Sequence, residues 1–220
     1  MSKGLTLAID ASTYRGTVAV LEGRVIVATS EVAMRGEREE RLMPAVAAAL
    51  GIAGAAIPDL ARVVVGAGPG SFTSLRIGAA LAKGICVARG SPLAAMPSLA
   101  LLVAGADNPA EDGRYLAILD AMRGDVHAAI IEVRAGNVIT VSEEQLLPRG
   151  AVAGLASRRE AHVVGGGERP DAQPHARGLA RLDDSLVRDV SLTAWEPAYG
   201  RLAEAQVKWE AEHGRSLAAG

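Results

Sequence analysis

The stretch VVVGAGPGSFTSLRIGAALAKGICVA, residues 63–88, decides the fold, because it leads from a buried strand into a helix through a glycine-rich turn. The three valines belong to an apolar run that predicts a strand over residues 62–66. After the turn, apolar and small residues at helical spacing predict a helix over residues 73–89. A strand, a turn and a helix in this order are typical of α/β proteins, which is the fold class we expect.

The residues before this stretch predict a meander of three antiparallel strands. Apolar runs at residues 5–10, 16–21 and 24–30 are separated by turn residues. Residues 37–51 then have a charged start and apolar residues at helical spacing, which predicts an amphipathic helix. Pro44 lies inside this pattern, so the helix either kinks there or begins there.

The same pattern partly recurs in the second half of the chain, after a polar, turn-rich boundary at residues 105–113. Two related lobes with mixed sheets flanked by helices are therefore the economical architecture. The further predicted elements are strands at 91–95, 114–120, 126–133, 138–141 and 162–165, helices at 97–104, 149–160 and 195–213, and a loop at 165–178 with little core-forming content. We place the first lobe at residues 1–106, the second at 107–190, and in 191–220 a terminal helix that packs back on the first lobe.

The composition disfavours several classes of function. A formal net charge of −2 at pH 7 and a pI near 6.1 give no positive field that would hold RNA or an anionic membrane. With one Phe, three Tyr and two Trp, the chain also lacks an aromatic platform for stacking bases. A single cysteine fits a reducing compartment, and neither a signal peptide nor an apolar run of roughly 20 residues is visible. We expect a cytoplasmic protein with no membrane segment.

The glycine turn has a phosphate-binding and a purely structural interpretation. Glycines between a strand and a helix allow close backbone approach, and the N–H groups of the helix can cradle an anion. A P-loop would require a lysine directly before the serine or threonine, but Ser71 and Phe72 follow the last glycine. A dinucleotide fingerprint would require an acidic residue about twenty positions further on, where the chain has residues 89–91, Arg-Gly-Ser. In the structural alternative, the glycines form the turn and a hydroxyl side chain caps the helix.

The helix predicted after the turn has small residues beside larger apolar ones. Gly78, Ala79, Ala80 and Ala82 leave room for another backbone to approach closely. Such a face usually packs inside the protein, but when it is exposed to water it favours association with another helix. The sequence leaves both outcomes open.

Five segments carry a resemblance to a known family, and GPGSFTSLRIG at residues 68–78 is the most specific part of it. The segments are LAIDAST at 7–13, ERLMPAV at 40–46, GAGPGSFTSLRIGAALAKGI at 66–85, LDAMRGDVHAAIIE at 119–132 and PAYGRLAEAQ at 197–206. They resemble the TsaB family, also called YeaZ, the bacterial partner of the enzyme that makes threonylcarbamoyladenosine in tRNA. Two departures are Ser74, where the family usually has glycine, and residues 149–190, which do not align.

The resemblance implies an actin-like, sugar-kinase-like fold without the activity of the catalytic paralogue TsaD. That paralogue carries a metal-binding pair of histidines on its first helix, whereas residues 36–44 of this chain contain no histidine. We therefore expect no metal, no catalytic residue and no cofactor held by this chain, and leave open a nucleotide at the subunit interface of the complex. The four histidines lack ligand spacing, so we expect ordinary side chains at His127, His162, His175 and His213.

A weak or vestigial nucleotide site is a further expectation. In actin-like ATPases the first hairpin approaches the phosphates and a hydrated magnesium, which a carboxylate can hold through water. In the alternative, Asp10 closes its strand and accepts backbone N–H bonds in the turn. Cys86 is expected to be a small buried side chain rather than a nucleophile. The candidate nucleotide-binding residues are Asp10, Ser12, Thr13, Gly68, Gly70 and Ser71.

The main functional hypothesis is that the first two helices form a helix bundle with TsaD, in a heterodimer that supports the active site of TsaD. In the family, the complex also recruits the ATPase TsaE and modifies the adenosine next to the tRNA anticodon, so tRNA would be met only through the complex. The same face allows a homodimer in isolation. The candidate contacts are Arg38, Arg41, Leu42, Val46, Arg76, Gly78, Ala79, Ala82 and Lys83.

Two rival functions belong to other classes. An actin-like ATPase or phosphotransferase would use Asp10 and the glycine turn. A peptidase is the activity once attributed to the wider glycoprotease family, but the sequence shows neither a metal pair nor a nucleophile with an oriented base.

Overall fold

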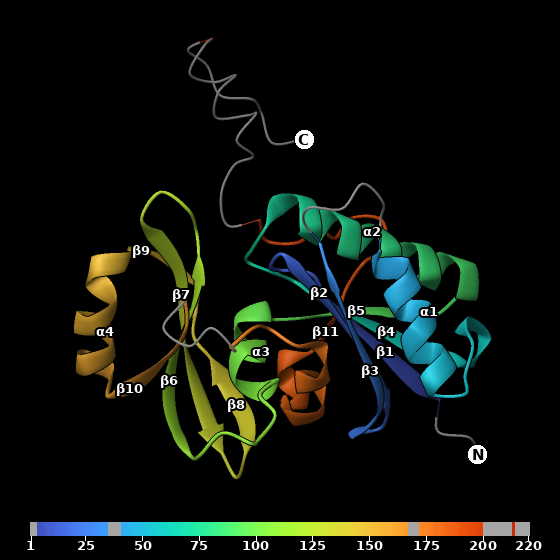
Figure 1. Cartoon of the computed structure of the whole chain (residues 1–220), viewed down its shortest axis with the longest axis horizontal. Helices are drawn as coiled ribbons and strands as arrows, with labels where there is room; N and C mark the ends of the chain where they lie inside the picture. The colour runs from blue at the N-terminus through green and yellow to red at the C-terminus, as the bar shows by residue number, and fades with distance from the viewer. Residues whose placement is uncertain (1–3, 35–40, 167–171, 200–212, 214–220) are drawn as a thin grey trace.

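The computed structural model describes residues 4–34, 41–166, 172–199 and 213, which form five packed layers. From right to left in Figure 1 the layers are helices α1 (Leu42–Ile52) and α2 (Phe72–Arg89), a first sheet, helix α3 (Ser98–Ala104), a second sheet, and helix α4 (Val152–Arg159). Each lobe is built on one of the two sheets. The predicted two-lobed α/β fold with mixed sheets flanked by helices is confirmed.

The first sheet contains β1 (Leu5–Asp10), β2 (Arg15–Glu22), β3 (Val25–Ala33), β4 (Leu60–Gly66), β5 (Leu93–Met96) and β11 (Arg188–Asp189). Its strand order is β11-β5-β4-β1-β2-β3. The first three strands form the predicted antiparallel meander, and β4 and β5 continue the sheet parallel to β1. Because β1 and β4 are parallel neighbours, their carboxyl ends bring Asp10 beside the glycine turn that follows Gly66.

The second sheet contains β6 (Gly113–Asp120), β7 (Asp125–Arg134), β8 (Asn137–Val141), β9 (Gln145–Pro148) and β10 (Ala161–Gly165). Its strand order is β10-β6-β7-β8, and β9 also pairs with β7. Here too a meander is extended by a parallel strand, β10 beside β6, so the predicted recurrence is confirmed. The sequence analysis missed β9, a short strand of four residues that ends in proline.

The helix boundaries settle one open alternative. Helix α1 begins at Leu42, so Pro44 lies in its first turn, where no backbone N–H is needed for a bond within the helix. Gly90, with φ of 69°, ends α2 in the left-handed conformation. No helix in the described part of the chain is long and apolar enough to cross a membrane. Short 3-10 helices are η1 (Ile57–Asp59), η2 (Arg149–Ala151), η3 (Ala176–Arg181) and η4 (Asp184–Leu186).

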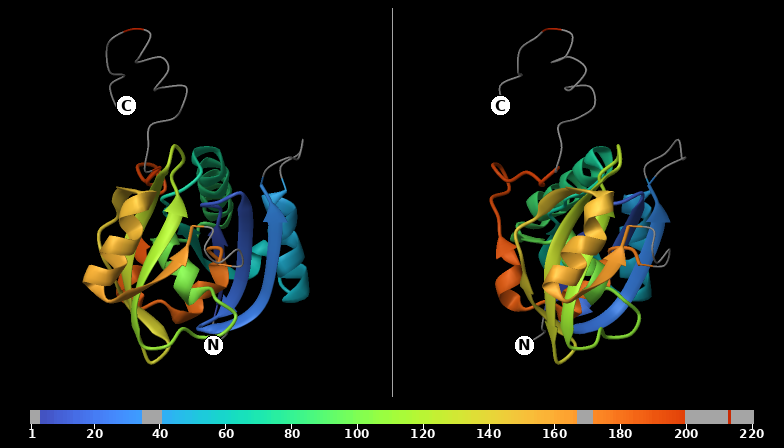
Figure 2. Two further views of the ribbon diagram at one scale, coloured as in Figure 1. Left: turned by 60° about the vertical axis from the view of Figure 1, so that its left-hand side comes forward. Right: turned by 90° about the vertical axis from the view of Figure 1, so that its left-hand side faces the viewer.

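Three groups of buried side chains hold the layers together. Helices α1 and α2 share one face of the first sheet, through apolar residues of both helices and of the strands. The opposite face packs on α3, which also contacts the inner face of the second sheet, so both lobes share this second core. Helix α4 covers the outer face of the second sheet (Figure 2).

The segment after β11 differs from the prediction. Residues 195–199, at the start of the predicted terminal helix, are not helical, and residues 200–212 lie outside the described residues. The described part of this segment packs on the first lobe, where Trp195 joins the core below α1 and α2. The backbone N–H of Ala198 donates a hydrogen bond of 2.8 Å to the carbonyl of Ala67 in the glycine turn.

Candidate functional site

Asp10 lies at the carboxyl end of β1 and is fully buried. Its Oδ1 accepts hydrogen bonds from the backbone N–H of Ser12 at 3.0 Å and from the Ser12 hydroxyl at 2.6 Å. Its Oδ2 accepts the hydroxyl of Ser98 at 2.6 Å. Burial raises the pKa of Asp10, and the hydrogen bonds from Ser12 and Ser98 oppose this rise. The carboxylate is thus occupied by the protein's own donors, as in the structural alternative for this residue.

The glycines of the turn are explained by close contact with the Asp10 hairpin. A Cβ atom at Gly66 would lie 1.9 Å from Asp10 Oδ2, and one at Gly70 would lie 1.9 Å from the Ser12 carbonyl oxygen. The backbone N–H of Ser71, just before α2, donates to the same carbonyl at 2.7 Å. Packing against the hairpin therefore requires these glycines, and one of the N–H groups at the start of α2 is bonded inside the protein.

The structure brings together only part of the predicted nucleotide site. Asp10, Ser12, Gly70 and Ser71 meet at the hairpin. The Thr13 hydroxyl instead bonds to the backbone of Arg15, and the remaining residue, Gly68, faces the C-terminal segment: a Cβ atom there would lie 2.3 Å from the Ala198 carbonyl oxygen.

Ser98 is the residue of this cluster that sequence reasoning missed. It is fully buried, bonds to Asp10 across 88 positions of sequence, and accepts the backbone N–H of Gly68 at 3.0 Å. The sequence pattern predicted the start of a helix near Ser98 but did not indicate a hydrogen bond with Asp10.

The raised pKa of Asp10 predicts a pH dependence of stability. Between the ordinary value of 3.8 and the raised value, the folded protein binds more protons than the unfolded chain, so the free energy of unfolding falls as pH rises. Asp10→Asn should remove this component, so that the variant gains stability relative to the parent as pH rises above about 4. Urea unfolding of both proteins from pH 4 to pH 8 measures the difference, and parallel curves would contradict the prediction.

Five of the predicted partner contacts on α1 and α2 are buried in the core of this chain. Leu42, Val46 and Ala82 are fully buried, and Gly78 and Ala79 are also buried. The reason is that the small residues near the centre of α2 let the helix approach the first sheet: a Cβ atom at Gly78 would lie 3.1 Å from the Ala11 Cβ.

The positively charged residues among the predicted partner contacts differ from one another in their exposure to solvent. Arg41 and Arg76 are exposed, whereas Lys83 is half-buried and donates a hydrogen bond of 2.6 Å to the Trp195 carbonyl. Arg38 lies outside the described residues.

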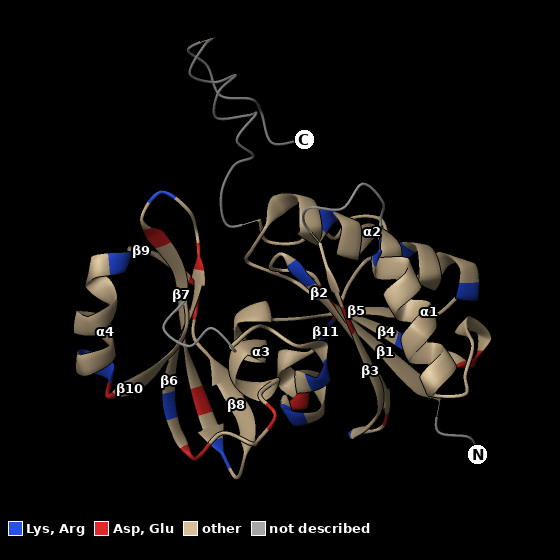
Figure 3. Cartoon of the chain, viewed as in Figure 1, with Lys and Arg blue, Asp and Glu red and all other residues tan. Residues whose placement is uncertain are grey.

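A different set of side chains forms the outer face of the two helices, which we call the α1–α2 face. It is apolar and rich in small residues, and neither helix contains an acidic residue (Figure 3). Two of its large apolar side chains, Ile52 and Val87, are 69% and 72% exposed. The α1–α2 face consists of Ala47, Ala48, Gly51, Ile52, Ile77, Ala80, Leu81, Gly84, Val87 and Ala88.

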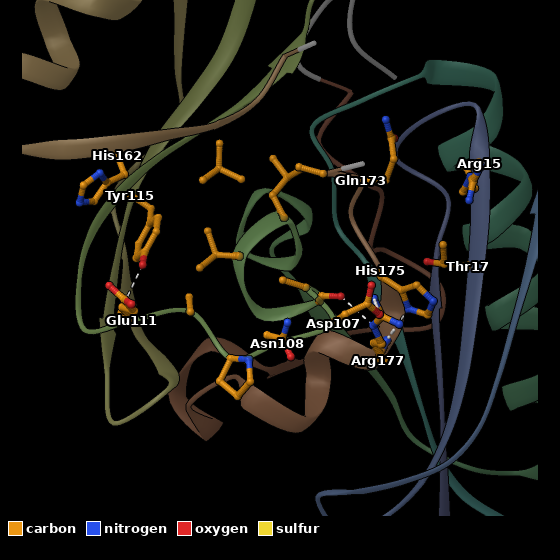
Figure 4. Close-up of a pocket in the computed structure, with 18 of the residues that line it drawn as sticks. Arg15, Thr17, Asp107, Asn108, Glu111, Tyr115, His162, Gln173, His175 and Arg177 are labelled. Atoms are coloured by element: carbon orange, nitrogen blue, oxygen red, sulfur yellow. Dashed lines mark hydrogen bonds and ion pairs between the residues drawn. The ribbon is translucent and has the colours of Figure 1, made fainter. Parts of the chain in front are cut away.

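A cavity of about 1000 Å³ lies between the two lobes (Figure 4). Its walls come from β2 and β3 of the first lobe, from Tyr115 and His162 of the second, and from the segment before η3. Glu31 pairs with Arg15 on one side and with the imidazole of His175 at 3.2 Å on the other. Arg177 pairs with Asp107 at 2.7 Å. The charges that line the cavity are thus largely neutralised by one another.

Two histidines are more buried than the sequence suggested. His175 is 5% exposed, and its Nδ1 accepts the backbone N–H of Arg177, so the proton must lie on Nε2 when the ring is neutral. Burial, and then the charge of Arg177, lower the pKa of His175, although Glu31 opposes this. His127 is 3% exposed and bonds to Glu144 at 2.6 Å. The prediction that the loop at residues 165–178 contributes little to the core is wrong at its C-terminal end, because His175 and Ala176 are buried between the lobes.

Among the residues that the structure describes, neither a metal site nor an activated nucleophile is present. The described residues contain no group of three or more His, Cys, Asp or Glu side chains that could hold a metal ion. Cys86 is fully buried, as predicted, and burial raises the pKa of its thiol, which makes it a poor nucleophile.

Comparison with known proteins shows which family the chain belongs to. Residues 31–175 match the family described as "TsaD: tRNA N6-adenosine threonylcarbamoyltransferase". The chain is 34% identical to the Bacillus subtilis "tRNA threonylcarbamoyladenosine biosynthesis protein TsaB" over 139 residues, which are 63% of this chain and 60% of that protein. It is 33% identical to the Escherichia coli protein of the same name over 123 residues, 56% of this chain and 53% of that protein. These relatives confirm the resemblance drawn from the sequence.

A solved structure agrees with the fold. YeaZ from Pseudomonas aeruginosa superposes with a TM-score of 0.72 at 24% identity, over 89% of this chain and 99% of that one. The sequence alignments, by contrast, span only about half to three fifths of the length of the two curated relatives.

Proposed function

Because the chain belongs to the family of TsaD, the tRNA N6-adenosine threonylcarbamoyltransferase, we propose that it is the non-catalytic partner of a TsaD enzyme in the synthesis of threonylcarbamoyladenosine in tRNA. It binds TsaD through the α1–α2 face and supports the active site of that subunit. The heterodimer recruits the ATPase TsaE and meets tRNA as a complex, and the chain works in the cytoplasm without a cofactor of its own.

The exposed α1–α2 face is the observation that carries this proposal. Two neighbouring helices present alanine and glycine residues to solvent, with large apolar residues such as Ile52 and Val87 beside them. Exposed apolar surface of this kind favours association, and small residues let the helices of a partner pack closely. The exposed Arg76, together with the lack of acidic residues on the two helices, favours a partner with acidic groups. Self-association would instead bring like charges together, so a homodimer should be the weaker complex.

The burial and hydrogen bonding of Asp10 favour a non-catalytic role for this chain. A phosphotransferase would need this carboxylate to reach a metal or a phosphate, but here it is buried and bonded to Ser12 and Ser98. The glycine turn, moreover, packs against the Asp10 hairpin with no room for added atoms at Gly70. These contacts disfavour the ATPase alternative.

Reconstitution of tRNA modification tests the proposal. The TsaD and TsaE proteins of the same genome are combined with tRNA, ATP, threonine, bicarbonate and the enzyme that forms threonylcarbamoyl-adenylate, with and without this chain. Modification should require the chain, and an Asp10→Asn variant should restore it as well as the parent does. Full modification in its absence would defeat the proposal, and loss of function in Asp10→Asn would favour the ATPase alternative.

A further inference from the structure

The N-terminal half of α2 carries an arginine that is held in place by two aromatic rings. The guanidinium carbon of Arg76 lies 4.5 Å from the centre of the Phe72 ring and 5.7 Å from that of Tyr199. The two rings lie 4.6 Å apart at an angle of 49°. Phe72 is one turn before Arg76 on α2, whereas Tyr199 comes from the C-terminal segment. The guanidinium therefore packs against a pair of touching rings that come from two different segments of the chain.

The C-terminal segment is itself fixed to the helix and to the glycine turn. The Trp195 carbonyl accepts a hydrogen bond from Lys83 at 2.6 Å, and the Ala198 N–H donates to the Ala67 carbonyl at 2.8 Å. The close fit of Ala198 against Gly68, which has φ of 89°, leaves no space for a side chain at that glycine. Tyr199 is thus placed by its own backbone rather than by the stack alone.

Within the described part of the chain, the charge of Arg76 contacts aromatic rings but is not paired with a carboxylate. Arg76 is exposed and has no ion pair with any described carboxylate. The acidic residue of the adjoining segment, Glu196, accepts the Tyr199 hydroxyl at 2.6 Å. Burial, and then this hydrogen bond, raise the pKa of Tyr199, while a hydrogen bond with Arg76 opposes the rise.

From these contacts we propose that Arg76, stacked on Phe72 and Tyr199, is the anchor of the interface with TsaD and receives a carboxylate from an acidic side chain of that partner. An arginine fork binds a carboxylate through two parallel hydrogen bonds, and holding the fork in advance reduces the entropy lost on binding. Arginine and tyrosine are also among the residues that most often dominate the energy of an interface. This inference rests on the proposed function and adds to it the residue and the chemistry that select the partner.

Calorimetric titration of purified TsaD from the same genome into this chain tests the anchor. Arg76→Ala should weaken binding by roughly thirtyfold or more, the loss typical of an interface hot spot. Arg76→Lys keeps the charge but not the fork, and should weaken binding by about fivefold or more. Tyr199→Ala should weaken binding as well, because it removes one of the two rings that pack beside the guanidinium. Arg114→Ala, an exposed arginine of the second lobe, is the matched control and should bind as the parent does.

The outcomes separate this inference from the proposed function. If the parent binds TsaD and Arg76→Ala binds within twofold of it, the anchor is wrong while the partnership stands. If Arg76→Ala keeps TsaD binding but the assembled complex loses tRNA, the arginine contacts RNA phosphates and the carboxylate proposal is also wrong. If the parent itself does not bind TsaD, the proposed function fails. Because Arg76 is exposed, the melting temperatures of the variants should stay within about 2 °C of the parent, which verifies that they fold.

Discussion

Gly84→Glu should abolish copurification of TsaD with this chain, with binding weakened about a hundredfold or more. Gly84 lies in the middle of the α1–α2 face, and a Cβ atom there would meet no other atom within 4 Å. The free chain should therefore tolerate the glutamate, whereas a packed helix interface would bury its charge without a partner. Pull-down and calorimetric titration with TsaD measure the loss, and the melting temperature of the variant reports on folding.

Gly84→Ala provides the matched control for this result. Alanine is small enough to keep helices close and removes the entropic cost of glycine in an exposed helix, so it should stabilise the chain by about 0.5–1 kcal/mol. Its binding to TsaD should change far less than that of the glutamate variant. Unchanged binding by a folded Gly84→Glu protein would exclude this face as the interface. Gly78→Glu would not serve as this test, because Gly78 is buried against Ala11 and the variant would report on folding instead.

Gly70→Ala should destabilise the fold by roughly 3 kcal/mol or more, because the added methyl would lie 1.9 Å from the carbonyl oxygen of Ser12. The atom in the way is backbone, so relief requires the β1–β2 hairpin or the start of α2 to move. For a chain of this length the melting temperature should fall by about 6–12 °C. Thermal unfolding followed by circular dichroism measures the change.

The same alanine substitution at Gly84 should raise the melting temperature, so the pair separates a steric requirement from the general preference of helices for alanine. A Gly70→Ala protein as stable as the parent would show that the hairpin and the glycine turn do not pack as closely as described. Nucleotide plays no part in this prediction, because the clash exists within the protein itself.

Periodicity alone predicted most of the elements, because burial repeats at every second residue in a half-buried strand and every three to four residues in a helix. The meander of β1 to β3, the glycine turn and α2 all follow from such local patterns. The order of the strands in each sheet does not follow from local patterns. The recurrence of the meander after residue 113 nevertheless indicated two lobes.

What the sequence could not predict depends on contacts between distant segments. The hydrogen bond from Ser98 to Asp10 joins two residues 88 positions apart, and no pattern near either one indicates the other. The direction of the small-residue face of α2 was ambiguous for a similar reason: glycine and alanine occur both where the helix meets the sheet, at Gly78, and where it meets solvent, at Gly84. The segment before η3 is rich in polar residues and glycine, and only its place between the lobes buries His175.

The shared core around α3 limits how the two lobes can move. Helix α3 packs on both sheets, and Arg24 of the first lobe donates to the Leu182 carbonyl at 2.8 Å while Arg181 donates to that of Ala106 at 2.6 Å. A hinge that opened the lobes would expose this core and break these bonds, so hydrogen exchange in α3 should require the opening of both lobes together. Enzymes that clamp a substrate between two domains need such a hinge. In this chain the shared core instead makes the two lobes one rigid unit, so the shape of the surface that carries the α1–α2 face is set when the chain folds.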